Sequence, residues 1–371
     1  MKISFIVQDL VGQGVQYATA IIARAFAARG HLVEILVSKV NDDKILAGGK
    51  MFELPPEVKV ITMPYRKARQ NIAYLRRYLK CHKVNYLIIE SELYAMSVGI
   101  AITFLNNKYL PQISQVIHGT IYPISGSYLK ILKQQIKFWF FHRRFHSILF
   151  VCKRSEIEIK KLMRFVPRIK TATVNNACCD DLFWSLTELP AKHPWLVKKI
   201  YPTFVAAGSY TYGKRFKLLI EAFRIIKNNY KMHLRIVIFG RGQEEEMYKS
   251  IIKKYVLDDY VSIGGFTDQL PAEIKASDGL ISASFEESFG ITIVEGLACG
   301  VPVLAADAPW GPREILADGK YGRLVPVDNV NAMAEAIIDL AYGKIPVASS
   351  ESWERYTIHK ILKKYCDAMG I

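Results

Sequence analysis

Two glutamates, Glu287 and Glu295, have types and a spacing that could do chemistry, with seven residues between them. An apolar strand over 279–283 leads into a polar loop that carries Glu287, and a helix expected over 289–299 carries Glu295. The neighbours of Glu295 on that helix are apolar, and a buried carboxylate is costly unless it is paired or hydrogen-bonded. Two interpretations stay open. Glu295 pairs with a lysine or arginine elsewhere, or it accepts hydrogen bonds from the hydroxyls of a bound sugar or ribose.

Three further segments that carry candidate functional residues also follow expected strands. Gly14 closes a Gly-Gln-Gly run after the first strand, where glycine lets the backbone approach a ligand, but the third glycine of a dinucleotide fingerprint is missing. His118 ends another strand and is either a donor or acid facing a ligand or a partly buried, satisfied histidine. Lys214, with Arg215 beside it, follows the glycine-bearing loop of Gly208 at a helix start. Lys214 binds a diphosphate or is a solvated lysine at a helix end.

The amides of Ser288, Phe289 and Gly290 are expected at a helix N-terminus, where they add positive potential. The chain contains no D-x-D triplet, Walker A sequence, H-E-x-x-H or G-x-S-x-G motif. We therefore expect no metal site and no cofactor. Any nucleotide-sugar chemistry would have to neutralise its leaving diphosphate with lysine, arginine and helix amides.

Strand and helix patterns alternate along the chain, which predicts α/β domains with doubly wound parallel sheets. The first domain is expected over 1–187 and the second over 200–345, joined by a linker at 185–201 that is rich in proline and lysine. A last helix over 351–371 is expected to pack back on the first domain. Ligands of such sheets bind at the carboxyl ends of strands, so two domains that face each other would bind a ligand in the cleft between them.

The formal charge of +16 suggests an anionic partner, and 51% apolar residues suggest a well-packed globular protein. Residues 128–146 combine basic and aromatic residues without any acid, a pattern typical of a helix on an anionic membrane surface. The alternative is a half-buried helix whose lysine stems cover apolar surface. No apolar run is long enough to span a bilayer. The six cysteines fit neither a zinc site nor a disulfide framework, which predicts a reducing cytosol.

In this order the segments resemble glycosyltransferase family 4, the retaining enzymes of GT-B type. The resemblance runs nearly end to end and is strongest over 261–326. It rests on Glu287 and Glu295 as an E-x7-E motif, on Gly208 and Lys214 before a Leu-Leu-Ile-Glu-Ala-Phe helix, and on the segments at 300–303, 311–316 and 319–326. The chain departs from the family where Ser209 replaces an arginine and Gln13 replaces a glycine.

The resemblance implies a GT-B architecture, with two Rossmann-like domains facing across a cleft, and a role for each motif residue. Lys214 would hold the donor diphosphate, with Arg215 substituting for the missing arginine. Glu287 and the amides of residues 288–290 would hold the donor sugar, and Glu295 the ribose. His118 would contact the sugar near the reacting centre. Gly14 and Gly208 would let the backbone approach the phosphates.

We therefore expect a retaining, metal-independent transferase that moves a sugar from a nucleotide diphosphate donor, most simply a UDP-sugar. The acceptor would be a hydroxyl of a cell-surface polysaccharide, a lipopolysaccharide or a lipid-linked glycan. The protein would be cytoplasmic and peripheral on the inner face of the plasma membrane, with no nucleic-acid partner. Two alternatives remain: a nucleotide-sugar epimerase of the same fold, and a non-enzymatic protein on this scaffold that binds RNA or lipid.

Overall fold

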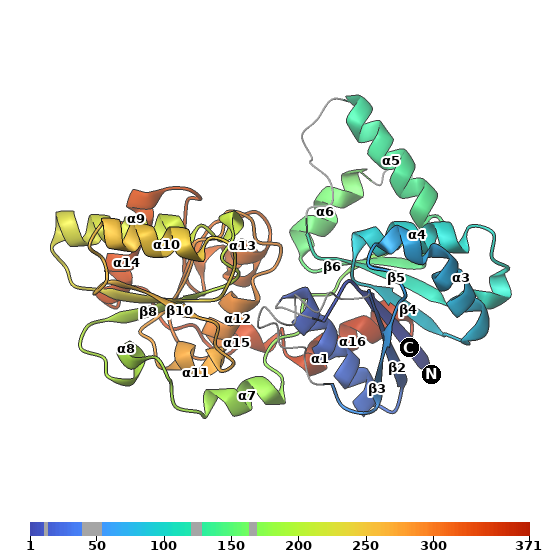
Figure 1. Cartoon of the computed structure of the whole chain (residues 1–371), viewed down its shortest axis with the longest axis horizontal. Helices are drawn as coiled ribbons and strands as arrows, with labels where there is room; N and C mark the ends of the chain where they lie inside the picture. The colour runs from blue at the N-terminus through green and yellow to red at the C-terminus, as the bar shows by residue number, and fades with distance from the viewer. Residues whose placement is uncertain (11–13, 39–53, 120–127, 163–168) are drawn as a thin grey trace. The chain divides into compact units, whose positions relative to one another are not determined.

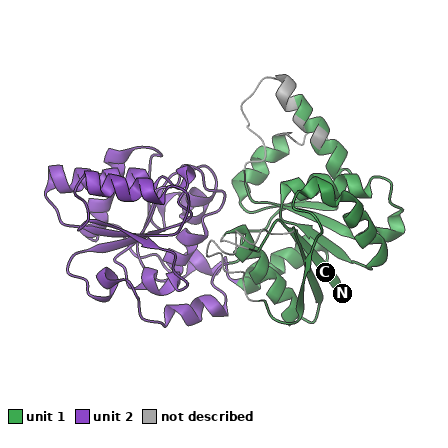
Figure 2. Ribbon diagram, in the orientation of Figure 1, with its two compact units in different colours: residues 1–177, 358–371 green, residues 178–357 purple. Residues whose placement is uncertain are grey.

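The computed structural model describes residues 1–10, 14–38, 54–119, 128–162 and 169–371; of helix residues 128–131, 134, 137 and 162 it describes the backbone. The chain divides into two compact units (Figure 2). Unit 1 comprises Met1–Ala177 with Ile358–Ile371, and unit 2 comprises Cys178–Thr357. Each unit contains a parallel sheet with helices against it (Figure 1). The prediction of two α/β domains with parallel sheets is confirmed.

The sheet of unit 1 has seven parallel strands in the order β3-β2-β1-β4-β5-β6-β7. The strands are β1 (Lys2–Val7), β2 (Leu32–Val37), β3 (Val58–Thr62), β4 (Tyr86–Ile89), β5 (Gln112–Ile117), β6 (Ser147–Phe150) and β7 (Lys170–Thr173). The order reverses between β1 and β4. Open α/β sheets bind ligands at such a switch point, beyond the carboxyl ends of the strands.

Helices flank both faces of this sheet because side chains of a strand point alternately to opposite sides. The helices are α1 (Val15–Ala28), α3 (Ile72–Cys81), α4 (Glu92–Ile102), α5 (Tyr128–His142), α6 (Lys153–Leu162) and α16 (Ile358–Met369), with short 3-10 turns at Ala68–Asn71 and Asn107–Tyr109. Phe5 of β1 contacts Phe26 of α1, whereas Ile6 belongs to the apolar cluster with α3 and α4. Tyr365 of α16 meets Phe26 edge-on.

The sheet of unit 2 has six parallel strands in the order β10-β9-β8-β11-β12-β13. The strands are β8 (Thr203–Ala207), β9 (Arg235–Phe239), β10 (Val261–Gly265), β11 (Leu280–Ser282), β12 (Val303–Ala306) and β13 (Arg323–Val325). The order reverses between β8 and β11. The switch point of unit 2 therefore lies at the carboxyl ends of these two strands.

The helical elements of unit 2 pack on both sides of its sheet. They are α7 (Asp181–Thr187), α8 (Pro194–Val197), α9 (Phe216–Ile225), α10 (Glu245–Lys254), α11 (Leu270–Lys275), α12 (Ile291–Ala298), α13 (Gly311–Ile315), α14 (Val330–Ala341) and α15 (Glu351–Glu354). Short turns are η3 (Tyr212–Lys214), η4 (Ile226–Tyr230) and η5 (Ala317–Gly319). Buried residues of α9 and α14 form one apolar cluster with strand residues of the sheet.

The segment expected as a linker, 185–201, belongs to unit 2. Its start is held because α7 packs against α11. The amide of Gln269 donates to the carbonyl of Pro190 at 2.6 Å, and the buried carboxylate of Glu273 accepts from the backbone N–H of Lys192 at 2.9 Å. These polar contacts satisfy groups of an irregular segment that would otherwise be solvated.

The predicted last helix, 351–371, is two helices in the structure. The first, α15, belongs to unit 2, and the second, α16, belongs to unit 1. Tyr356, between them, is buried with its ring against Phe289 at 5.2 Å, and its carbonyl accepts from the backbone N–H of Cys178. Tyr356 therefore lies at the end of the part of 351–371 that belongs to unit 2, which extends to Thr357.

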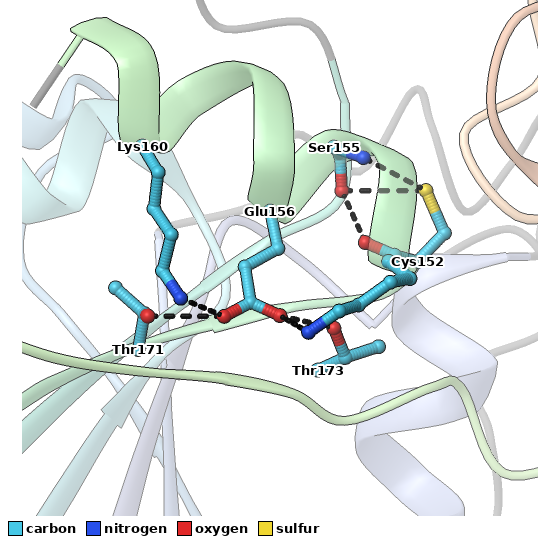
Figure 3. A network of polar contacts seen from close by, with 7 residues as sticks. Cys152, Ser155, Glu156, Lys160, Thr171 and Thr173 are labelled. Atoms are coloured by element: carbon cyan, nitrogen blue, oxygen red, sulfur yellow. Dashed lines mark hydrogen bonds and ion pairs between the residues drawn. The ribbon is translucent and has the colours of Figure 1, made fainter.

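A buried glutamate ties α6 to β7 in unit 1 (Figure 3). The carboxylate of Glu156 accepts from Lys153 at 2.8 Å, from Thr171 at 3.0 Å and from Thr173 at 2.7 Å, and it pairs with Lys160 at 2.6 Å. Burial alone would raise the pKa of Glu156, but these donors outweigh burial and lower the pKa to about 2. The charged carboxylate is therefore part of the folded structure of unit 1.

We expect Glu156→Gln to lower the melting temperature of unit 1 at pH 7, because the amide replaces a charged acceptor by a neutral one. A depressed folded pKa contributes stability above the unfolded pKa, and this contribution is lost as pH falls toward 2. The difference in melting temperature between the two proteins should therefore shrink when thermal unfolding is followed at pH 4 and then pH 3. An equal difference at pH 7 and pH 3 would contradict the role of the ionised carboxylate.

Candidate functional site

Lys214 and Glu287 form an ion pair at the switch point of unit 2. Lys214 lies in η3, after β8, and Glu287 lies in the loop after β11. The two strands are neighbours in the sheet, so their carboxyl ends share one edge. The ammonium Nζ of Lys214 lies 2.5 Å from Oε2 of Glu287, and the hydroxyl of Ser284 donates to the same oxygen at 3.2 Å. The sequence alone did not specify this pairing, because it depends on the order of the strands.

Glycines bring the backbone of β8 and β9 together under Lys214. The side chain of Lys214 covers Gly208, where a Cβ atom would lie 3.3 Å from its Cδ. A Cβ on Gly240, after β9, would lie 1.8 Å from the carbonyl oxygen of Gly208. Both positions therefore favour glycine. The backbone N–H of Gly208 donates to the carbonyl of Phe239 at 3.0 Å.

The local structure around Lys214 differs from the predicted helix start. The helix was expected from Lys214, but α9 begins at Phe216, because Arg215 adopts the left-handed conformation with φ of 54°. The guanidinium of Arg215 lies 3.7 Å from the ring centroid of Tyr212, and its Nε lies 2.8 Å from a carboxylate oxygen of Asp328. Arg215 thus has a carboxylate partner of its own within unit 2.

The loop that carries Glu287 is fixed against the segment after β12. The N–H of Gly311 donates to the carbonyl of Glu287 at 3.1 Å. A Cβ on Gly311 would lie 1.8 Å from the carbonyl oxygen of Phe289, so the two segments touch backbone to backbone. Trp310 reaches this contact with a φ of 78°, unusual for a bulky residue. The Gly-Pro-Arg-Glu segment therefore holds the Glu287 loop in place through these backbone contacts.

Residues 288–290 precede the helix rather than opening it. The helix α12 begins at Ile291, two residues later than expected, and Gly290 before it has a left-handed φ of 105°. Phe289 is buried, and Ser288 is half-buried. The amides at this helix start are therefore those of Gly290, one of the predicted residues, and of the residues just after it.

Glu295 is a buried acid on α12, three residues before the helix ends at Ala298. Burial, and next the negative charge of Asp180, raise the pKa of Glu295 to about 7. Within the part of the chain that the structure describes, no side chain or backbone group makes a hydrogen bond or ion pair with its carboxylate. No described lysine or arginine therefore pairs with Glu295, as the first interpretation required. Its carboxylate can accept hydrogen bonds from a ligand.

Unit 1 carries the other predicted residues at its own strand ends. Gly14 immediately precedes α1 and has a φ of 79°, a conformation that favours glycine, whereas residues 11–13 lie outside the described residues. His118 follows β5, and its Nε2 lies 2.5 Å from Oε2 of Glu90, which follows β4. Glu90 was not singled out from the sequence, although its position at a strand end next to the switch point was a usable signal.

Among the described residues, no group of three or more His, Cys, Asp or Glu side chains could hold a metal ion. Burial raises the pKa of the Cys178 thiol, and the thiol of Cys179 is shifted in the same direction by burial and by Glu295. All six cysteines are reduced, so none of them forms a disulfide.

Comparisons with known proteins agree with this fold. Residues 189–359 match the family model described as glycosyl transferases group 1. The chain is 21% identical over 308 residues to the N-acetylgalactosamine-N,N'-diacetylbacillosaminyl-diphospho-undecaprenol 4-alpha-N-acetylgalactosaminyltransferase of Campylobacter jejuni, a match that covers 81% of this chain and 74% of that protein. Two Bacillus subtilis relatives match over only 33% and 18% of their own length.

Solved structures resemble the whole chain. HepE of Anabaena in complex with UDP has a TM-score of 0.76 at 17% identity, with 100% of both chains covered. A mutant of S. aureus TarM in complex with Fondaparinux, alpha-GlcNAc-glycerol and UDP has a TM-score of 0.75 at 14% identity, again with 100% of both chains covered. Residues 189–359 therefore resemble the glycosyl transferases group 1 family, and the chain as a whole has the fold of GT-B glycosyltransferases.

Proposed function

We propose that this protein is a retaining, metal-independent glycosyltransferase that moves a sugar from a UDP-sugar to a hydroxyl of a lipid-linked or cell-surface glycan. The observation that carries the proposal is the Lys214–Glu287 pair at the switch point of unit 2, where sheets of this type bind ligands. The two solved relatives in complex with UDP support the nucleotide, and the undecaprenol-linked substrate in the name of the Campylobacter relative supports a lipid-linked acceptor.

Lys214 and Glu287 have complementary roles in this proposal. In the free protein each neutralises the other at 2.5 Å. A bound donor gives each a new partner: diphosphate oxygens for the ammonium, and sugar hydroxyls for the carboxylate. The ammonium then stabilises the negative charge that develops on the leaving diphosphate, which is the largest contribution a site of this kind makes.

Glu295 accepts hydrogen bonds from the ribose, using the acceptor capacity that no described residue occupies. Gly14 and Gly208 let the backbone approach the phosphates, and the amides around 288–290 add positive potential. Arg215 supports the diphosphate in place of the arginine missing at Ser209. Transfer runs by front-face attack, with the leaving diphosphate helping to deprotonate the acceptor hydroxyl, and catalysis is mostly positioning and electrostatics.

A donor screen tests this function. Purified protein is heated with a panel of nucleotide diphosphate sugars, and a bound donor raises the melting temperature, because ligand at 100 times its Kd stabilises the fold by about 2.7 kcal/mol. The donor that stabilises is then incubated with and without lipid-linked acceptor. Transfer only with acceptor supports the proposal, whereas conversion of the donor sugar without acceptor identifies an epimerase. No stabilisation by any nucleotide sugar would contradict both enzymes.

A basic and apolar surface of unit 1 supports an anionic membrane as the partner of helix 128–146. Helix α5 exposes a set of large apolar side chains, Leu132, Ile136, Trp139 and Phe140. Lys133 and Arg143 are exposed beside them, and the guanidinium of Arg143 lies 4.9 Å from the ring centroid of Phe140. Within the described ranges, no helix is long and apolar enough to cross a membrane.

The neighbouring helix α4 also exposes apolar side chains, which was not foreseen from the sequence. It exposes Leu93, Met96 and Ile100, whose spacing of three and four residues puts them on one side of the helix. Phe104, just after α4, is 88% exposed. The two helices touch at Gly99, where a Cβ would lie 2.5 Å from the carbonyl oxygen of Phe141. In this proposal the protein is cytoplasmic and peripheral on the inner face of the plasma membrane.

We expect the double variant Lys133→Glu and Arg143→Glu to bind anionic vesicles at least about tenfold more weakly than the wild type, since each basic residue near such a surface contributes about 1 kcal/mol. Cosedimentation with vesicles of phosphatidylglycerol and phosphatidylcholine measures this. The matched control is Lys217→Glu, an exposed lysine of unit 2. Wild-type protein that cosediments equally with vesicles of phosphatidylcholine alone would contradict the electrostatic part, and no cosedimentation at all would contradict the membrane partner.

A further inference from the structure

Glu90 and His118 form a buried pair at the carboxyl ends of neighbouring strands in unit 1. The strands β4 and β5 are paired, with Ile89 opposite Gln115, so the residues that follow them share one edge of the sheet. Nε2 of His118 lies 2.5 Å from Oε2 of Glu90. The side chain of His118 is 11% exposed and that of Glu90 is 2% exposed. The pair is next to the switch point between β1 and β4.

The carboxylate decides which ring nitrogen of His118 carries a proton. An ionised carboxylate only accepts hydrogen bonds, so the short contact requires a proton on Nε2. The other nitrogen, Nδ1, is buried and has no hydrogen-bond partner among the described residues. A proton there would make a charged, buried N–H without an acceptor, which costs more than a neutral nitrogen with an unused lone pair. The contacts therefore favour the tautomer that has its proton on Nε2 and a lone pair on Nδ1.

We propose that Glu90 is a positioning residue that holds His118 in the tautomer with Nε2 protonated, so that Nδ1 accepts a hydrogen bond from a sugar hydroxyl. This inference rests on the proposed transferase function. It assigns a direction to the contact that a histidine near the reacting centre makes: the ring accepts and the sugar donates.

The direction of this hydrogen bond restricts what His118 can bind. An unprotonated nitrogen attracts a hydroxyl group but repels the oxygens of a diphosphate, which at neutral pH have only lone pairs to offer. His118 therefore contacts a sugar hydroxyl and not a diphosphate. The hydroxyl belongs to the donor sugar or to the acceptor, and the chemistry of the contact is the same for both.

Two substitutions of His118 distinguish its two nitrogens. Asparagine puts its carbonyl oxygen as far along the side chain as Nδ1, whereas glutamine puts its carbonyl oxygen as far as Nε2. We expect His118→Asn to retain about tenfold more kcat/KM than His118→Gln, and His118→Gln to lose about 10- to 100-fold relative to wild type, the effect of one lost hydrogen bond in the transition state. The reverse order, or a His118→Gln variant with wild-type kinetics, would overturn the assignment of Nδ1.

Nitrogen-15 spectra of the histidine rings read the tautomer in the free protein, with the His118 signals identified by their loss in His118→Asn. We expect a protonated Nε2 and an unprotonated Nδ1 at pH 7.5, and in Glu90→Gln a mixture of tautomers with a kcat about tenfold lower. A pair with only a structural role would give Glu90→Gln a lower melting temperature but a wild-type kcat. That result, or a proton on Nδ1 in the wild type, would overturn the proposal.

Hydrolysis of the UDP-sugar without acceptor identifies the source of the hydroxyl. If the donor sugar provides it, Glu90→Gln slows hydrolysis and transfer alike. If the acceptor provides it, hydrolysis is unchanged and the KM for acceptor rises. Failure of the transferase function itself is seen separately, because wild-type protein would then neither transfer sugar nor bind a UDP-sugar, whatever the ring spectra show.

Discussion

We expect Glu287→Ala to abolish most sugar transfer and to leave the protein folded. The carboxylate of Glu287 is 16% exposed at the edge of the sheet, where it accepts from Lys214 and from Ser284. Alanine removes the acceptor for the donor sugar hydroxyls, and the loss of such a preorganised contact costs roughly 10²- to 10³-fold in kcat. Lys214→Ala should have an effect of similar size, because the developing charge on the diphosphate then has no ammonium to stabilise it.

The fold should tolerate both changes because the Lys214–Glu287 ion pair is partly exposed, and pairs of this kind contribute about 0–1 kcal/mol. Steady-state transfer with the stabilising donor, together with melting temperatures, measures both effects. The matched control is Lys217→Ala, a lysine of the same segment that pairs loosely with Glu221 on the surface of α9. A folded Glu287→Ala protein with near-normal turnover would mean that the site has been assigned to the wrong residues.

Glu295→Gln should raise the stability of the free protein at pH 8 while weakening its affinity for UDP. The folded pKa of Glu295 is raised to about 7 from 4.5, mainly by burial. The folded state therefore binds more protons than the unfolded state between these values, so stability falls as pH rises from about 4.5 to about 7. The ionised carboxylate costs the folded protein at most about 3 kcal/mol above pH 7, and glutamine removes that cost.

Affinity for UDP should move in the opposite direction. Ribose hydroxyls donate more strongly to a charged carboxylate than to an amide, so we expect Glu295→Gln to bind UDP about tenfold more weakly at pH 8. Wild-type affinity should also decline as pH falls below about 7, because Glu295 becomes protonated, and the glutamine variant should lack that decline. Calorimetric titration with UDP and thermal unfolding, each at pH 5.5 and pH 8, separate the two effects. A glutamine variant that is less stable than wild type at pH 8 would instead indicate a structural partner for Glu295.

Local patterns were sufficient to predict the alternation of strands and helices, the parallel sheets and the fact that candidate residues follow strands. Lys214 and Glu287 were each recognisable because an apolar strand and a glycine-bearing or polar loop precede them. Their contact depends on β8 and β11 being neighbours, which follows from the winding of the whole sheet and not from either segment. The same reason explains why Glu90 was missed: it becomes noticeable only when β4 and β5 lie side by side.

Other differences also arise from contacts between distant segments. The helix after Lys214 starts late because Arg215 turns left-handed, where its guanidinium reaches Asp328, more than a hundred residues later. The predicted linker at 185–201 is part of unit 2, where the carboxylate of Glu273 on α11 accepts a hydrogen bond from the backbone N–H of Lys192. The sequence pattern within those two segments does not indicate that Asp328 or Glu273 is the partner. The acceptor capacity of Glu295 likewise follows from what surrounds α12, whereas its spacing from Glu287 left pairing and ligand binding equally open.

The most direct test of the account is the stereochemistry of the product made by the wild-type protein. The UDP-sugar that stabilises the protein is incubated with a lipid-linked acceptor, and the new glycosidic bond is examined by proton NMR. We expect a product that forms only with acceptor and keeps the α configuration that the donor sugar has at its anomeric carbon. A β-linked product, or an altered free nucleotide sugar formed without acceptor, would contradict the proposed transfer.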